Sequence, residues 1–131
     1  MRELEYKYDN NILKIDSSDI TVEQYLNNWF ETYCLNNLKL TTYTGYRQHI
    51  DNYICPRIGH MKIVDLRPIE VQTMYCELLK NGRMNGKKPL NPKTVIQTYR
   101  ILRKALKNAV MLQIIEKNPC DYVETPKKKI L

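Results

Sequence analysis

One segment near the start of the chain constrains the fold more than any other. Its apolar side chains recur every three or four residues, at Val22, Tyr25, Leu26, Trp29, Phe30 and Tyr33. At roughly 100° per residue these positions share one face of an α-helix. Asp19 or Thr21 is a suitable N-cap for that helix. We interpret the aromatic stripe as part of a hydrophobic core.

Glycine and proline are sparse, and they separate three further helical segments. The second helix is predicted from Thr41 or Thr42 to about Cys55, because a residue before a proline avoids the α region. The connector 57–67 follows, with room for a short extended piece. The third helix is predicted to begin at Pro68 and to stop at Asn81 and Gly82. The sequence thus predicts an all-α fold.

The fourth helix is predicted from Pro92, with Asn91 as its N-cap, to near Ile115. Its two faces differ in chemistry. Apolar side chains occupy one side, and a basic stripe falls within an arc of about 80° on the other, at Lys93, Gln97, Arg100, Lys104 and Lys107. Most surface helices expose Lys and Arg in this way, so the stripe is either a solvated surface or a site for an anionic partner.

Size and charge narrow the choice of partner. A chain of 131 residues is long enough for one modest core, and its net charge is +7. Such an excess favours phosphate or another anionic surface as partner. No run approaches the roughly 18 apolar residues that span a bilayer, and the charged start lacks the apolar region of a signal peptide. We therefore expect a cytoplasmic protein with no membrane partner.

Catalytic and metal-binding patterns are missing from the sequence. The four cysteines include no C-x-x-C pair, and the two histidines fit no familiar zinc spacing. We expect buried, reduced cysteines, no metal and no cofactor. There is no Gly-rich phosphate loop and no G-x-S-x-G. The tyrosines lie mostly on apolar stripes, where they fill core. We expect the chain by itself not to be an enzyme.

Three features favour nucleic acid over a solvated surface for the stripe. No acidic residue lies between Glu77 and Glu116, so the stripe has no local ion-pair partner. The first turns of the fourth helix would meet base edges and phosphates in a major groove. The second helix starts with further donors, where the macrodipole favours a phosphate oxygen. These features make Lys39, Thr41, Thr42, Lys93, Thr94, Gln97, Arg100 and Lys104 candidate DNA-binding residues.

The order and spacing of these segments resemble a known family. The relevant stretches are "TVEQYLNNWFETY", "TTYTGYRQHIDNYICPRIGHMKIVDLRPIEVQTMYCELL" and "LNPKTVIQTYRILRKALKNAVMLQIIEKNPCDYVETPK". They include Thr42 and Tyr46, the "IG" at Ile58 and Gly59, and the "NP" at Asn118 and Pro119. Over about residues 20–126 the chain resembles the core-binding, or SAM-like N-terminal, domain of the tyrosine recombinase (phage integrase) family.

The resemblance implies a compact bundle of four to five helices that grips one face of core-site duplex DNA. It places DNA contacts at the start of the second helix and along the fourth helix. It thereby adds Gly45 and His49, with Gln48 on the same helix face, to the candidate DNA-binding residues. Gly45 could take part only through its backbone. The family's catalytic domain is expected to follow in the same parent chain, and other recombinase protomers are expected partners on DNA.

The resemblance also suggests a division of the chain. Residues 1–18 are expected to form an N-terminal arm, as a short strand or disordered. Residues 19–117 are expected to form the helical domain, and residues 118–131, with three consecutive lysines, a linker towards a catalytic domain.

A helical protein-interaction module for assembly of a recombinase complex is the alternative function. A stand-alone transcriptional regulator is disfavoured, because no tightly joined helix-turn-helix is evident.

Overall fold

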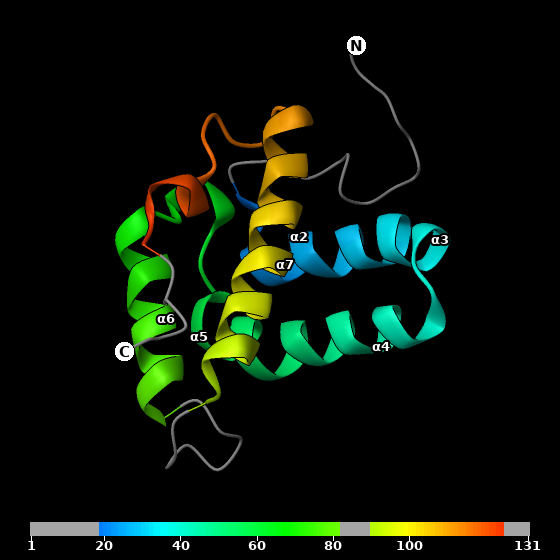
Figure 1. Ribbon diagram of the computed structural model, residues 1–131. Coiled ribbons are helices and arrows are strands. Elements are labelled where there is room, and N and C mark those ends of the chain that lie inside the picture. The colour runs from blue at the N-terminus through cyan, green and yellow to red at the C-terminus, as the bar shows by residue number, and fades with distance from the viewer. Residues whose placement is uncertain (1–18, 82–89, 125–131) are drawn as a thin grey trace.

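Residues 19–81 and 90–124 are described by a computed structural model (Figure 1). The first helical run joins α2 (Val22–Trp29), the π-helical segment η2 (Phe30–Cys34) and α3 (Leu35–Asn37). The second joins α4 (Leu40–His49), the π-helical η3 (Ile50–Ile54) and α5 (Cys55–Ile58). The 3₁₀ turn η4 (Ile63–Asp65) precedes α6 (Pro68–Asn81), and the 3₁₀ turn η5 (Pro119–Tyr122) follows α7 (Pro92–Met111). Within these residues the predicted all-α bundle is confirmed.

The start of α2 is fixed by hydrogen bonds from both sides. Thr21 is the N-cap, and it exchanges hydrogen bonds with Gln24 in a capping box. The N–H of Val22 donates to the Met61 carbonyl at 2.8 Å, and the N–H of Glu23 donates to the Gly59 carbonyl at 3.0 Å. The extended piece expected in the connector 57–67 is one antiparallel bridge between Thr21 and Lys62. The free donors of the first turn are therefore used by the fold itself.

Pro56 does not end the second helical run, so the expected stop near Cys55 is wrong. The run continues through α5 to Ile58, with Pro56 in the first turn of α5. Just before it, the Cys55 N–H donates to the Ile50 carbonyl, five residues back, in the π-helical register. A π turn is wider than an α turn, and it has room for a proline that would otherwise clash with the preceding turn.

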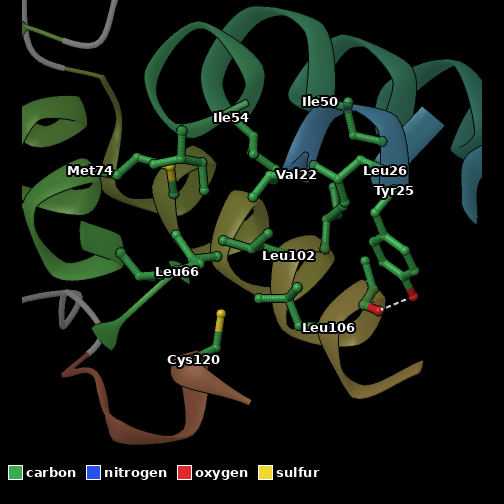
Figure 2. Close-up of a cluster of buried hydrophobic side chains, with 14 of the residues drawn as sticks. Val22, Tyr25, Leu26, Ile50, Ile54, Leu66, Met74, Leu102, Leu106 and Cys120 are labelled. Carbon is green, nitrogen blue, oxygen red and sulfur yellow. Dashed lines mark hydrogen bonds between the residues drawn. The ribbon is translucent and has the colours of Figure 1, made fainter. Parts of the chain in front are cut away.

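The core lies where α7 crosses the two helical runs (Figure 1). Leu102 and Leu106 of α7 are fully buried and lie near Val22, Leu26 and Ile50 of the two runs, as Figure 2 shows. Burying each such side chain contributes about 1.5–3 kcal/mol. Polar groups are also matched, since the Tyr25 hydroxyl donates to the Ala105 carbonyl at 2.7 Å.

The C-terminus of α7 differs from the prediction. The helix ends at Met111, not near Ile115. Gln113 has a φ of 64°, and beyond it the Ile114 N–H donates to the Ala109 carbonyl at 2.9 Å. This left-handed cap closes the helix as a glycine would in a Schellman motif. The sequence offered no signal because glutamine rarely occupies that region.

Packing continues past residue 117, where the sequence analysis ended the helical domain. Asn118, Pro119 and Cys120 are buried, and η5 packs against α6 and α7. The Asn118 amide donates to the Arg103 carbonyl at 3.0 Å, and its oxygen accepts from the Cys120 N–H at 2.9 Å. Residues 118–124 thus pack with the helices, and the expected arm 1–18 and the rest of the expected linker lie outside the described residues.

All four cysteines are free thiols, two of them buried. Cys34 and Cys120 are buried, and burial raises the pKa of Cys34 to about 11 and that of Cys120 to about 12. Cys55 is half-buried. Cys76 is exposed on α6, so the prediction that it would be a buried small hydrophobe is wrong. Its position falls between the buried Tyr75 and Leu78, outside the apolar face of that helix.

Candidate nucleic-acid interface

The first turn of α4 is open to solvent. The helix begins at Leu40 with Lys39 as N-cap, not at Thr41 or Thr42 as predicted. The Lys39 side chain makes no capping hydrogen bond, and Lys39, Thr41 and Thr42 are all exposed. The first N–H groups of a helix have no acceptor within it. The turn therefore presents backbone donors, two hydroxyls and an ammonium group together.

The next turns of α4 continue the same face. Gly45 and His49 are half-buried and Gln48 is exposed. A Cβ placed on Gly45 would meet no atom within 4 Å, so the backbone there borders open space. Arg47, on another face, is engaged within the fold: its guanidinium donates to Asp51 at 2.6 Å and to Asn27 at 2.7 Å. The free surface of α4 is therefore uncharged beyond Lys39.

The basic side chains of α7 are exposed as predicted. The Asn91 side chain accepts from the Lys93 N–H at 2.8 Å, which caps the helix. Lys93, Arg100 and Lys104 are exposed, whereas Thr94 and Gln97 are half-buried. Among the described residues, none of these three cations forms an ion pair. Lys93 and Lys104 are about 16 Å apart along the axis, close to the roughly 12 Å width of a major groove.

The two predicted halves of the site meet where α7 crosses the end of α4. His49 Nδ1 lies 2.7 Å from the Thr98 hydroxyl oxygen. Six residues further along α7, the Lys104 ammonium lies 5.1 Å from the centroid of the Tyr33 ring. Tyr33 in turn stacks on Trp29 at 5.6 Å. Lys104 is therefore held against an aromatic stack by a cation–π contact. Lys39, Thr41 and Thr42 lie at the opposite end of α4.

Two groups in this junction have shifted pKa values. Burial lowers the pKa of His49, so its ring is neutral at pH 7. Burial has the largest single effect on the pKa of Lys104 and lowers it, but the neighbouring Tyr33, Tyr46 and Cys34 side chains together raise that pKa above its usual value. The interface thus combines one neutral imidazole with persistent positive charge.

A groove extends the basic surface beyond the predicted residues. It has a volume of about 810 Å³ and runs between α7 and residues 116–122. Arg100, Lys104 and Lys107 line one wall. Lys117 lies on the other side, together with Glu116 and with Asp121, which pairs with Arg103. The candidate list omitted Lys107, although it belongs to the basic stripe. Lys117 had no sequence signal, because the left-handed turn at Gln113 brings it back towards α7.

Other site types find no support in the described ranges. No group of three or more His, Cys, Asp or Glu residues in residues 19–81 and 90–124 is arranged to hold a metal ion. Within the same ranges, no helix is both long and apolar enough to cross a bilayer.

Comparison with known proteins supports the resemblance seen in the sequence. Residues 21–79 match the family described as phage integrase, N-terminal SAM-like domain. The phage integrase SAM-like domain from Moorella thermoacetica has a TM-score of 0.67 and 27% identity, with 88% of this chain and 93% of that chain covered. This chain therefore has the fold of the SAM-like domain of phage integrases. The integrase-like domain from Bacillus cereus agrees, with a TM-score of 0.73, 23% identity and coverage of 88% and 91%. No curated protein sequence matches the chain.

The two kinds of similarity cover different parts of the SAM-like domain. The family match ends at residue 79, so it includes α4 but none of α7. The match to solved structures extends over most of the chain. The fold of the half that contains α7 is therefore supported by the solved structures and not by the family match. What the surface of α7 can bind follows from the side chains of this chain alone.

Proposed function

We propose that this SAM-like domain binds duplex DNA through the face formed by α4 and α7, as the core-site grip of a tyrosine recombinase. The observation that carries the proposal is the row of exposed cations on α7 that have no ion-pair partner among the described residues. The open first turn of α4, at the other end of that helix from the α7 contact, adds further donors. Unpaired cations and free helix N–H groups are the donors that phosphate oxygens accept from.

The proposed role is binding and not chemistry. Cleavage and joining of DNA are assigned to a catalytic domain elsewhere in the parent chain, and this domain would hold the core site during integration or recombination. Affinity would come from about 4 to 8 phosphate contacts, and then falls roughly 10²- to 10⁴-fold between about 50 and 200 mM salt. Side chains at the start of α7 would add a modest sequence preference.

The first test is an NMR titration of backbone amides with a short duplex at two salt concentrations. We expect salt-sensitive shifts at residues 39–49 and 91–104, because those segments form the α4 and α7 face. Shifts in the groove at Lys107 and Lys117 would extend the footprint along α7. Unchanged amides in all these segments, with duplex in excess at low salt, would rule out this face.

Charge reversal provides a matched variant pair. Arg100→Glu places an acid in the row of cations and should lower the duplex affinity at least tenfold at low salt. Lys80→Glu makes the same charge change at an exposed position near the end of α6, a helix that is not part of the proposed face, and should have a much smaller effect. Equal loss in the two variants, measured by fluorescence anisotropy, would mean that net charge alone governs binding.

A protein-docking role is the second candidate, and one observation favours it. Met111, Leu112 and Tyr122 are 70%, 63% and 63% exposed at the far end of α7. Exposed apolar side chains of this size suit a partner such as another recombinase protomer. Leu112→Ser should impair such assembly and leave duplex binding by the isolated domain unchanged, because Leu112 does not line the groove.

A further inference from the structure

Thr98 makes two short polar contacts that require two protons. Its hydroxyl oxygen lies 2.9 Å from the Thr94 carbonyl oxygen and 2.7 Å from His49 Nδ1. Both distances are those of a hydrogen bond. The hydroxyl itself carries one proton, and the Thr94 carbonyl carries none. The second proton must therefore come from the imidazole ring.

The alternative arrangement is unfavourable. If Thr98 donated its proton to His49, the oxygens of Thr98 and Thr94 would face each other at 2.9 Å with only lone pairs between them. Thr98 is fully buried, so no solvent screens that repulsion. A buried threonine in a helix commonly donates to the carbonyl four residues back, as Thr98 does here. The geometry is satisfied when His49 Nδ1 carries a proton and donates it to Thr98.

A proton on Nδ1 determines the chemistry of the other ring nitrogen. In a neutral imidazole the second nitrogen, Nε2, is then a bare acceptor. None of the described residues forms a hydrogen bond with His49 Nε2. If this atom were fully buried, it would be a buried polar atom without a partner, but among the described residues the only such side-chain atom is Trp29 Nε1. Within the part of the chain that the structure describes, His49 Nε2 is therefore open to solvent. It also shares the α4 face with Gly45, four residues earlier, whose backbone borders open space.

We infer that Thr98 acts as a positioning residue that presents His49 Nε2 as a hydrogen-bond acceptor, and that this acceptor reads the amino group of an adenine or cytosine in duplex DNA. The second part rests on the proposed function. In the major groove these amino groups are the donors that the bases offer, whereas a phosphate oxygen is only an acceptor and would face Nε2 lone pair to lone pair. His49 would therefore contribute to sequence preference and not to general affinity.

The first experiment needs no DNA. Long-range proton–nitrogen NMR of the free domain at pH 7.5 distinguishes the two neutral tautomers of His49. We expect the proton on Nδ1 in the natural sequence and in Thr98→Ser, which keeps the hydroxyl. Thr98→Val has nearly the same volume but no acceptor, and we expect the proton to move to Nε2. A proton on Nε2 in the natural sequence would overturn the inference and leave the proposed function standing.

The second experiment tests the reading of a base. A duplex selected by the natural domain from a randomised pool is resynthesised with single adenines replaced by purine, or single cytosines by pyrimidin-2-one, each of which lacks the amino group. We expect one position where the loss lowers affinity roughly three- to tenfold, the worth of one hydrogen bond. Loss of the amino group at the same position should lower the duplex affinity of Thr98→Ser but not that of Thr98→Val or His49→Ala.

The remaining outcomes separate the two levels of the proposal. Binding with no position sensitive to the amino group in the natural domain would overturn the base contact while leaving DNA binding intact. Equal sensitivity in Thr98→Val, once its melting temperature shows that it is folded, would overturn the role of Thr98. Failure of every duplex to bind would overturn both the proposed function and the reading of a base.

Discussion

The two ends of the helical run from Leu40 to Ile58 differ in what satisfies the backbone around them. At the C-terminal end Gly59 is buried, its N–H donates to the Cys55 carbonyl at 3.0 Å and its carbonyl accepts from Glu23. At the N-terminal end the first turn of α4 is exposed and has no side-chain cap. One helical run thus has one end closed by the fold and one end left open for a partner.

The contrast also appears in the two described glycines. A Cβ on Gly59 would lie 2.6 Å from the Cys55 carbonyl oxygen, whereas a Cβ on Gly45 would meet nothing within 4 Å. Gly59 is therefore required by close packing inside the molecule. Gly45 is not required by packing, which suits a position where another molecule approaches the backbone.

The largest expected effect comes from removing the aromatic side chain that holds the run to α2. Trp29 is 2% exposed and stacks on Tyr46 of α4 at 6.2 Å. Trp29→Ala should lower the free energy of unfolding by about 3–5 kcal/mol, as for other buried aromatics, measured by urea denaturation. Trp29→Phe should cost less, because it keeps a ring and removes the Nε1 donor, which has no hydrogen-bond partner among the described residues. An equal cost for both variants would contradict this account.

The closed end gives the next largest effect. Gly59→Ala pushes a methyl group against backbone and should lower the free energy of unfolding by about 1–3 kcal/mol. The hydrogen bond from Glu23 to the Gly59 carbonyl should weaken, which hydrogen exchange at the Glu23 amide would detect. A stability equal to that of the natural sequence would show that the junction can yield.

The open end should respond in the opposite direction. Gly45→Ala adds a methyl group in open space within a helix, and should raise the free energy of unfolding by about 0.5–1 kcal/mol. If DNA approaches the backbone there, the same variant should bind duplex more weakly. Unchanged duplex affinity in a stabilised Gly45→Ala domain would remove Gly45 from the interface.

The smallest effect is a pH dependence at the junction of α4 and α7. The pKa of His49 is lowered by burial among Thr98 of α7 and Tyr53 of η3, so the unfolded chain takes up the proton first. The contribution of neutral His49 to the free energy of unfolding should therefore be complete above about pH 6.5 and decrease as the pH falls below that value. It should level off below the folded-state pKa. His49→Gln should lack this fall between pH 7 and 5, as compared by urea denaturation.

Local patterns predicted the starts of helices better than their ends. Thr21, Pro68 and Asn91 mark helix starts because each acts through its own ring or side chain. The end of α7 depends on a left-handed glutamine, and Pro56 is accepted only because of a π turn before it. Both depend on backbone geometry that residue type alone does not encode.

The candidate site was predictable to a similar degree. The exposed face of α7 follows from helical spacing, which fixes Lys93, Arg100 and Lys104 on one side. The contact between His49 and Thr98 joins residues 49 positions apart, and no local pattern could reveal it. Lys117 was missed for the same reason, since its place in the groove results from tertiary packing.

The segment that follows α7 has a mechanical consequence. Asn118 ties it to α7, and at its end Glu124 exchanges hydrogen bonds with the Gln72 side chain of α6, at 3.1 and 3.3 Å. A force applied to the chain beyond Glu124 would therefore be transmitted to α6 through Gln72 and to α7 through Asn118. Tension from that side would reach the helix that carries the basic row before it reached α4.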